Sequence, residues 1–571
     1  MDISRRGFLG SALLVGGAAA VGSLAGCAST PDQATETTAE VTSGAPPTRD
    51  DIIVPHTASE KTASFGFCTF DTEEPPPLDP PATWDYEVDV VVAGTGGGLA
   101  AASRCASSGK SVIALEANNI HGGVSKSACL YYFATGTKCQ LEAGIPDITE
   151  MLREQTLALY PPGERYEKHV DNCLKGMKDL VAWTEELGFA WEPGWIDGEQ
   201  KVVFTVAPVG SQDGGNSFRM LTEIENFYDK VFLDNGGEYF FETRISGLVM
   251  ENGEIIGVQA TPNSGEPFFI KAEKGVILAT GGMANNINMM KRYCPDAFYR
   301  SMVSNASNFD NGEGIRLGLG AGAGLDGYNN RGVFDGGIEG VDWNHMLYDA
   351  DIQIARQPWL QIDILGEQMK YDIAEYSVVG ETIARMPEAK IFSFFDANWE
   401  EYCEGFVLPM CRNLTKPDMP NQERWMGALD NDYRNGVNRA IEEDRIKSGN
   451  TPEELAEKLG IAPEYVKAAF DKWNEMVASG DGSAYGYQPE WLHPLDTPPF
   501  YGQALGAMTF STRAGLAISE NQEVLAEDGK VIPGLYAAGM TSGRPAYCIC
   551  GDVGYAATSS FLAANHILAT R

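Results

Sequence analysis

The stretch EVDVVVAGTGGGLAAASRCASSGKSVIALE, residues 87–116, decides the fold of this 571-residue chain. Its run 88–92, which is apolar and β-branched except at Asp89, is typical of a buried parallel strand. A glycine cluster follows at once, then an alanine-rich helical segment (99–107) and a second apolar strand (111–115) that ends in Glu116. This order places a pyrophosphate on a helix N-terminus and a ribose hydroxyl on a carboxylate. The sequence therefore predicts a dinucleotide-binding βαβ unit, with a cofactor site that includes Gly94, Gly96, Gly98 and Glu116.

The glycine cluster departs from the usual GxGxxG pattern at one position. The third glycine would fall at position 99, but the chain has Leu99 there and reads GTGGGL, with Gly98 one residue early. The strands, the helix and the acid all keep the expected spacing, so we retain the prediction of dinucleotide binding. The alternative is a purely structural turn between strand and helix.

Three later segments resemble a single family of flavoproteins. They are NNIHGGVSKSACLYYFATGT (118–137), GVILATGG (275–282) and VIPGLYAAG (531–539). In this order they resemble fumarate-reductase flavoprotein subunits and 3-ketosteroid dehydrogenases, over most of the chain from Tyr86 onward. That family binds FAD, so the resemblance implies FAD as the cofactor. The residues that it adds to the predicted cofactor site are Ala117, Gly123, Val124, Ser125, Ala279, Gly281, Glu313, Gly539 and Met540.

The resemblance also implies a fold class and a domain order. We expect an α/β fold in which a Rossmann-like FAD-binding domain is interrupted by an inserted α+β capping domain that holds the substrate. The FAD-binding domain would occupy residues 85–330 and 491–571, and the capping domain residues 331–490. Local signals add a hairpin with Asn252 and Gly253 at its turn and a helix that begins at Thr451.

The first residues resemble an export signal. SRRGFL (4–9) matches the twin-arginine pattern, and an apolar stretch rich in glycine and alanine follows it. LAGC (24–27) resembles a lipobox, in which Cys27 would carry a lipid anchor; the alternative is an ordinary cleavage site. We expect a signal peptide over residues 1–27 and a disordered tether over 28–84. The predicted location is the periplasm or the outer face of the cytoplasmic membrane.

The amino-acid composition limits the classes of partner that the protein can bind. The chain has 42 Lys and Arg against 79 Asp and Glu, a formal net charge of -37, which argues against binding to nucleic acid or to an anionic membrane surface. The 11 cysteines are scattered, with no CxxC or CxxCH motif, so we expect no metal site and no covalently attached haem. Electrons would then come from a separate cytochrome or quinol-linked donor, and the other partner would be a small organic substrate.

The resemblance also shows which catalytic groups this chain lacks. Fumarate-reducing members clamp two carboxylates with arginines and histidines. Here the histidine position aligns with Phe510 or Ser511, one clamping arginine aligns near Cys550, and the proton-donating arginine aligns at about Tyr376. The loss of most of the clamp argues against fumarate or another small dicarboxylate as the substrate.

The remaining motifs resemble the ketosteroid branch. In LYYFATGTKCQ (130–140) and RPAYCICGDVGYAATSSF (544–561), tyrosines stand at positions that the branch uses for catalysis. A phenol donates a hydrogen bond to an enone oxygen and stabilises an enolate. The predicted catalytic residues are Tyr547 as electrophile and Tyr376 or Tyr132 as proton donor, with Arg513 and Arg385 as second candidates. With 22 tyrosines in the chain, packing is the competing explanation for each of them.

Three functional hypotheses follow. The first is an exported FAD-dependent reductase of an activated carbon–carbon double bond in an enone, an unsaturated lactone or an arylacrylate. The second is a 3-ketosteroid-type dehydrogenase that runs the same chemistry in the oxidative direction. The third is a lipoprotein that binds flavin or a ligand without turnover.

Overall fold

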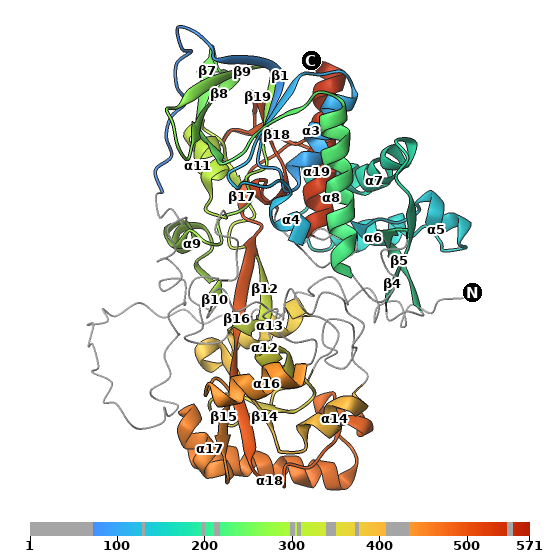
Figure 1. The fold of residues 1–571 in the computed structure, drawn as a ribbon, viewed down its shortest axis with the longest axis vertical. Coiled ribbons are helices and arrows are strands. Elements are labelled where there is room, and N and C mark those ends of the chain that lie inside the picture. The colour runs from blue at the N-terminus through green and yellow to red at the C-terminus, as the bar shows by residue number, and fades with distance from the viewer. Residues whose placement is uncertain are drawn as a thin grey trace.

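The predicted parallel unit lies at the centre of an eight-stranded sheet (Figure 1). Strand β1 (Tyr86–Ala93) pairs in parallel with β2 (Val112–Leu115) and with β9 (Phe268–Leu278), and helix α3 (Gly98–Ser107) connects β1 to β2. The strand order is β18-β19-β9-β1-β2-β6, and the hairpin of β7 and β8 is added beside β9. The computed structural model describes residues 72–127, 132–196, 200–209, 217–296, 303–304, 310–337, 350–371, 376–406, 433–544 and 552–571.

The alternation of side chains along β1 builds two cores. Val90 and Val92 pack into the core on one face of the sheet, while Val91 and Ala93 pack into the core on the other. Successive residues of a strand point to opposite faces, so a strand segment that is apolar at every position, as residues 90–93 are, must be covered on both sides. The continuous apolar run in the sequence is therefore explained by helices on one face and by a helix and hairpin layer on the other.

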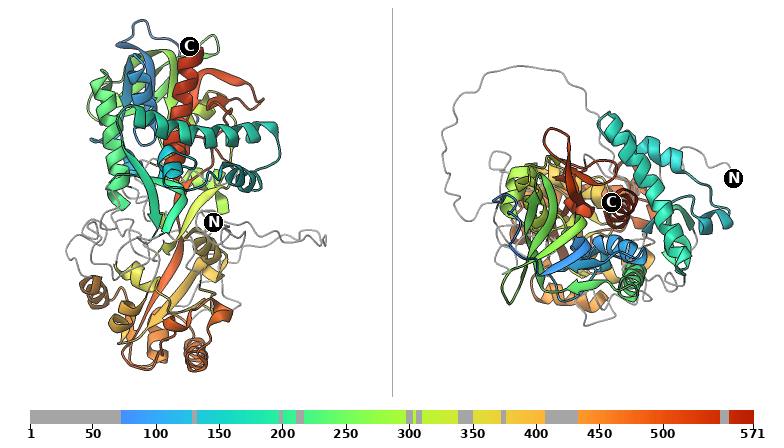
Figure 2. Two further views of the ribbon diagram at one scale, coloured as in Figure 1. Left: turned by 90° about the vertical axis from the view of Figure 1, so that its right-hand side faces the viewer. Right: turned by 90° about the horizontal axis from the view of Figure 1, so that it is seen from above.

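Helices α3, α7, α8 and α19 cover the first face, whereas α9, α11 and the β7–β8 hairpin lie at the second. Figure 2 shows α7 and the neighbouring small elements projecting from the side of this upper body. The bounds of the elements in the upper body are α4 (Gly123–Ser127), β3 (Tyr132–Phe133), α5 (Lys138–Glu142), α6 (Thr149–Leu157), α7 (Glu164–Glu186), β4 (Trp191–Ile196), β5 (Gln200–Pro208), α8 (Ser217–Asp234), β6 (Glu238–Phe240), β7 (Thr243–Glu251), β8 (Glu254–Pro262), α9 (Ile287–Tyr293), α11 (Glu313–Gly320), β11 (Leu325–Asp326), β17 (Gly515–Leu516), β18 (Glu523–Leu525), β19 (Val531–Ala537) and α19 (Asp552–Thr570).

A second, six-stranded sheet forms the lower body around the long strand β16 (Phe500–Thr512). β16 and β12 (Arg331–Gly337) run antiparallel to each other and connect the two bodies (Figure 1). The aromatic-rich core below them includes Trp359, Phe394 and Trp473. The other elements of this body are β10 (Val303–Ser304), α12 (Ala350–Ala355), β13 (Leu360–Ile362), α13 (Tyr376–Arg385), β14 (Lys390–Phe395), α14 (Trp399–Gly405), α16 (Tyr433–Glu442), β15 (Lys447–Gly449), α17 (Pro452–Leu459) and α18 (Pro463–Ser479).

The α/β fold class is confirmed by this arrangement, while the predicted domain boundaries remain predictions. At the N-terminal side, residues 72–84 belong to the predicted tether but lie against the upper body. Leu78 forms a bridge to Val249 of β7, and the Glu74 carboxylate accepts a hydrogen bond of 2.7 Å from the Tyr293 hydroxyl. Among the helices of the described ranges, none has both the length and the apolar character needed to cross a membrane.

Candidate cofactor site and interdomain junction

The glycine turn after β1 brings three segments into close backbone contact. Gly94 adopts φ +91°, and a Cβ at this residue would lie 2.3 Å from the Ala279 carbonyl oxygen at the end of β9. A Cβ at Gly97 would lie 2.5 Å from the Ala556 Cβ in α19, whereas a Cβ at Gly96 would have no neighbour closer than 3.6 Å. The first turn of α3 has no side-chain cap. Its backbone N–H groups and the open space at Gly96 therefore suit a phosphate group.

Glu116 organises the loop beside this turn. One carboxylate oxygen accepts hydrogen bonds from the Thr95 hydroxyl and, at 3.2 Å, from the Thr95 N–H. The other accepts from the Asn118 N–H at 2.8 Å. The Thr95 oxygen in turn accepts from the Gly122 N–H at 3.0 Å. The Glu116 side chain is 6 % exposed, and these hydrogen bonds fix its position at the end of β2. This is the position that the ribose-binding acid occupies in the dinucleotide-binding fingerprint.

The segments predicted from the family resemblance lie around the same turn. A Cβ at Gly123 would be 3.4 Å from the Gly96 Cα, and the buried Ser125 hydroxyl is next to Gly96. On the other side, Gly281 has φ +89°, and its carbonyl accepts a 3.0 Å hydrogen bond from the Thr541 hydroxyl. The N–H of Gly539 donates to Ser559 at 2.9 Å. The first and last parts of the chain therefore meet at one edge of the sheet.

Other predicted cofactor residues take different positions. A Cβ at Gly98 would lie 2.9 Å from both the Ala279 Cβ and the Val92 Cγ1, so the glycine allows α3 to approach the sheet. Glu313 begins α11, where Arg244 lies 3.5 Å from its carboxylate. The sulfur of Met540 accepts a hydrogen bond from Arg544 at 3.4 Å. Ala117 follows Glu116 directly and is half-buried, and Val124 lies in α4, where its side chain is outside the described set.

A buried cluster of charges lies at the junction between the two bodies. Asp552, the first residue of α19, accepts hydrogen bonds from Arg513 Nε at 3.1 Å and from Arg544 Nη2 at 3.0 Å. The side chains are 13 %, 8 % and 0 % exposed, respectively. Burial by itself raises the pKa of Asp552, but Arg513 and Arg544 together lower this pKa to about 2. Asp552 is therefore ionised, and the cluster as a whole carries one net positive charge.

Arg513 also connects the strands that join the two bodies. It follows β16 directly, and its Nη1 donates a 2.8 Å hydrogen bond to the carbonyl of Arg331, the first residue of β12. Arg544 packs its guanidinium over the ring of Tyr555, 3.9 Å from the ring centre. The cluster thus holds both connecting strands against the beginning of α19.

The structure describes some of the five predicted catalytic residues in full and others in part or not at all. Tyr547 lies outside the described residues, and of Tyr376 only its place at the start of α13 is described. Tyr132 is 2 % exposed in β3 and packs against Trp191, with ring centres 5.4 Å apart. Arg385 is exposed in the last turn of α13. Arg513 is placed at the junction, and the roles of all five residues stay predictions.

Sequence reasoning did not single out Arg544 or Asp552. Both lie within the segment 544–561 that contains Tyr547, and each is a charged residue in a largely apolar stretch, which was the available signal. That the two form one cluster with Arg513 depends on β16 and α19 meeting in space, although 39 residues separate Arg513 from Asp552.

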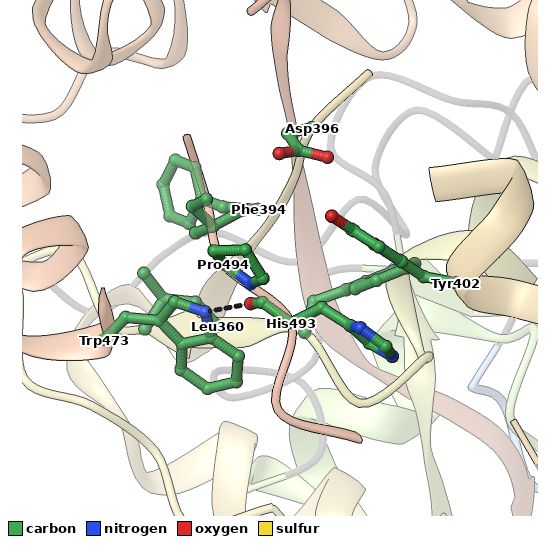
Figure 3. A pocket seen from close by; sticks show the side chains of 9 residues that line it. Leu360, Phe394, Asp396, Tyr402, Trp473, His493 and Pro494 are labelled. Carbon is green, nitrogen blue, oxygen red and sulfur yellow. Dashed lines mark hydrogen bonds between the residues drawn. The ribbon is translucent and has the colours of Figure 1, made fainter. Parts of the chain in front are cut away.

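The side chains that line a pocket in the lower body pack against and hydrogen-bond to their neighbours in the core (Figure 3). His493 stacks on Tyr402 with ring centres 4.0 Å apart, and its carbonyl accepts a hydrogen bond from Trp473 at 2.8 Å. Asp396 accepts backbone hydrogen bonds from Asn398 and Thr497. The space between these side chains has no room for a water molecule. We therefore assign this pocket to core packing.

The glycine turn, the open helix N-terminus and the aligned acid fit a dinucleotide, and the fold defines an α/β flavoprotein. The chain belongs to the family described as FAD binding domain, whose model matches residues 89–330 and 412–552. FAD is accordingly its cofactor, and the prediction of an FAD-dependent oxidoreductase is confirmed. Gly94, Gly96 and Glu116 would hold the cofactor's pyrophosphate and ribose.

Comparison with known proteins agrees with the predicted resemblance. The chain is 26 % identical to vinyl phenol reductase of Lactiplantibacillus plantarum, over 79 % of this chain and 89 % of that one. It is 24 % identical to digoxin reductase of Eggerthella lenta, over 95 % and 91 %. Among solved structures, it resembles a flavocytochrome c3 fumarate reductase (TM-score 0.61, 21 % identity, 85 % and 80 % covered). It also resembles the 3-ketosteroid delta1-dehydrogenase of Sterolibacterium denitrificans (TM-score 0.65, 18 % identity, 85 % and 100 % covered).

Replacing Glu116 by Ala is expected to weaken FAD binding about 10- to 100-fold, because the cofactor loses a charge-assisted hydrogen bond of about 1.5–3 kcal/mol. The measurement is a titration of the apoprotein with FAD, followed by flavin fluorescence. Glu87→Ala is the matched control, because Glu87 is an acid on β1 whose side chain is 57 % exposed. Equal affinities for the two variants would contradict the role of Glu116.

We expect the buried carboxyl group of Asp310 to make the free energy of unfolding depend on pH. Burial raises its pKa to about 7, although the N–H groups of Gly282 and Ala284 act in the opposite direction. Between about pH 4 and pH 7 the folded state therefore binds more protons than the unfolded state, so this residue's contribution to stability falls as pH rises. Relative to Asp310→Asn, the wild type should lose about 4 kcal/mol at most over this range. Urea unfolding of the FAD-loaded proteins at several pH values tests this, and a pH-independent difference would contradict it.

Proposed function

We propose that the protein is an exported, FAD-dependent reductase of an activated carbon–carbon double bond in an enone, an unsaturated lactone or an arylacrylate. Its electrons would come from a separate cytochrome or quinol-linked partner. The observation that carries the choice of substrate is the Arg513–Asp552–Arg544 cluster at the interdomain junction. Its two guanidinium groups are both hydrogen-bonded to an acid of the protein itself, which lowers their capacity to neutralise an anionic substrate.

The charge balance at the junction supports a substrate with at most one negative charge. Arg331 lies 3.5 Å from Glu381, and Arg513 and Arg544 share Asp552. These five side chains, all in the part of the chain that the structure describes, are three cations and two anions and leave one net positive charge. A dicarboxylate would need at least two compensating charges to be desolvated there. The names of two of the relatives, a vinyl phenol reductase and a digoxin reductase, support the same choice.

When bound, FAD supplies the hydride that is transferred from its N5 atom. The protein's contribution would be to align the double bond, to exclude water and to stabilise negative charge on the substrate's carbonyl oxygen. We assign that last role to the hydroxyl of Tyr547, with Tyr376 or Tyr132 as the proton donor.

Two alternatives remain distinct from this proposal. The likeness to a ketosteroid dehydrogenase structure favours the oxidative direction, in which the flavin is reduced by substrate and reoxidised by a quinone or a dye. The lipobox-like LAGC segment (24–27) motivates a flavin- or ligand-binding lipoprotein without turnover. In the first case a saturated substrate would bleach the flavin, and in the second no ligand would change its redox state.

An anaerobic dye assay tests the proposal. The flavoprotein is supplied with a reduced viologen, and dye reoxidation is followed with fumarate, urocanate, a cinnamate, a steroid enone and an unsaturated lactone. We expect turnover with a cinnamate, enone or lactone and none with fumarate, and Tyr547→Phe should lower that rate. Rapid turnover of fumarate would overturn the substrate assignment, whereas silence over the whole panel would favour the alternatives.

A further inference from the structure

The segment that precedes β1 lies against the layer that covers the second face of the central sheet, although the sequence predicts a tether there. Residues 72–84, which we call the N-terminal strap, run beside α11 and the β7–β8 hairpin (Figure 1). At the end of α9, the Tyr293 hydroxyl donates a 2.7 Å hydrogen bond to the Glu74 carboxylate, and Arg292 Nη1 lies 2.8 Å from the same oxygen. One acid of the strap thus binds two consecutive residues of α9.

The strap also crosses the last turn of α11. Arg316 Nε donates a 2.8 Å hydrogen bond to the carbonyl of Glu73. A Cβ at Gly320, the last residue of α11, would lie 2.0 Å from the carbonyl oxygen of Pro75, so a side chain at this position would displace the strap. Glycine at position 320 therefore lets the backbone of the strap contact the helix directly.

Main-chain hydrogen bonds join the strap to the hairpin. The Leu78 N–H donates a 2.7 Å hydrogen bond to the Leu248 carbonyl, and the Leu78 carbonyl accepts a 3.0 Å hydrogen bond from the Met250 N–H. These two bonds form the parallel bridge between the strap and β7. The strap is thus held at three places, by α9, by α11 and by the hairpin.

Two glycines of the upper body leave space for the strap. A Cβ at Gly247 of β7 would lie 2.8 Å from the Leu78 side chain, just as a Cβ at Gly320 would collide with Pro75. Glycine inside a strand or a helix destabilises the element by about 0.5–1 kcal/mol relative to alanine, so its presence there needs a further reason. The close approach of the strap provides that reason at both positions.

The other end of α11 forms part of the cofactor site. The N–H of Gly312, which directly precedes α11, donates to the Gly282 carbonyl at 2.8 Å, and the Gly314 N–H donates to the Thr280 hydroxyl at 3.1 Å. Thr280 and Gly282 flank Gly281, a predicted cofactor residue in the turn after β9. With eight residues, α11 is about 12 Å long, so the strap and this turn bind opposite ends of one short helix. A displacement of α11 at the strap would therefore also displace the turn.

We propose that the N-terminal strap positions α11 for the cofactor, so that docking of the strap and binding of FAD stabilise each other. Without the docked strap, α11 loses its contacts at Arg316 and Gly320 and occupies a range of positions, in some of which residues 280–282 no longer fit the cofactor. FAD then selects the arrangement in which the strap is docked. By linkage, the factor by which the strap raises the affinity for FAD equals the factor by which FAD favours docking of the strap.

Gly320→Ala tests the strap with a single methyl group. Alanine favours a helix over glycine, so the substitution should not weaken α11 itself, whereas the added Cβ would collide with the Pro75 carbonyl and expel the strap. Asp79→Ala is the matched control, because Asp79 is an exposed residue of the strap next to Leu78. The first readout is a titration of each apoprotein with FAD, followed by flavin fluorescence.

The second readout is hydrogen exchange of the strap, measured by mass spectrometry with and without FAD. Pro75, Pro76 and Pro77 have no N–H, so a peptide over this stretch reports mainly on the Leu78 amide, which is hydrogen-bonded to β7. We expect Gly320→Ala to weaken FAD binding at least tenfold and Asp79→Ala to leave it unchanged. In the wild type, FAD should slow exchange of the Leu78 amide at least tenfold, and Gly320→Ala should abolish this protection.

Equal affinities of Gly320→Ala and Asp79→Ala for FAD would overturn the coupling, and a loss of stability alone would show that the strap is only a structural support. Exchange of the Leu78 amide at one rate with and without FAD would overturn it as well. If Gly320→Ala does not fold, the double variant Glu74→Ala, Leu78→Asp releases the strap without changing the body, and an unchanged FAD affinity in that variant contradicts the proposal. Neither readout needs a substrate, so a failure of the substrate panel leaves this test independent.

Discussion

Replacing Asp552 by Ala is expected to lower the free energy of unfolding by about 3–5 kcal/mol, because the substitution leaves two buried guanidinium groups without their shared counter-ion. Arg544 is completely buried and Arg513 nearly so, and neither can reach bulk water without moving β16 or α19. The variant should also retain less FAD, since α19 contributes Ala556 and Ser559 to the edge where the cofactor binds. Urea unfolding and the flavin-to-protein absorbance ratio measure the two effects.

A control variant and a double-variant cycle make the Asp552 experiment specific. Asp528→Ala removes an acid whose partner, Lys530, is 83 % exposed, and it should have no measurable effect on unfolding. Arg544→Met in the Asp552→Ala background should recover part of the lost stability, because it removes one of the uncompensated charges. Purely additive effects of the two substitutions would show that the cluster is not an energetic unit. Since the pKa of Asp552 is lowered to about 2, its contribution in the wild type should be lost only in strong acid.

Replacing Gly97 by Ala is expected to cost about 3 kcal/mol or more and to abolish FAD binding. The added Cβ would lie 2.5–2.7 Å from the side chain and backbone of Ala556, which sits in a rigid helix and cannot move aside alone. The φ of Gly97 is −68°, so backbone strain makes no contribution and the effect is purely steric. A displaced α3 would lose its close contact with α19. That contact holds the N-terminus of α3 in the position where it can bind a phosphate. Thermal unfolding and FAD content check the result.

Gly109→Ala is the matched comparison for Gly97→Ala. Gly109 ends the same helical segment with φ +79°, but nothing lies within 4 Å of the Cβ that an alanine would add. The expected cost is about 1 kcal/mol from the left-handed backbone conformation, with FAD binding preserved. If both variants lost similar amounts of stability and FAD binding, the close packing of α3 on α19 would not be the reason why position 97 requires glycine.

Local patterns in the chain were sufficient for the elements that depend on neighbours in sequence. The run 88–92, the glycine cluster and Glu116 predicted the βαβ unit, and β1, α3 and β2 occupy these positions. Asn252 and Gly253 do form the turn between β7 and β8. Thr451 caps α17 by accepting a 3.1 Å hydrogen bond from the Glu454 N–H. These features arise from hydrogen bonds and side-chain alternation within a few residues, so the sequence pattern carries them directly.

The tertiary structure alone decided which residues that are distant in the chain come into contact. Asp552 meets Arg513 and Arg544 because β16 ends where α19 begins, and no local pattern encodes that meeting. The acid Glu225 on α8 gave no signal in sequence, since an acid on an amphipathic helix is usually solvated, and only the packing of α8 against α3 and α4 buries it. Burial then raises the pKa of Glu225, because the cost of a charge depends on the surrounding dielectric and not on the residue type.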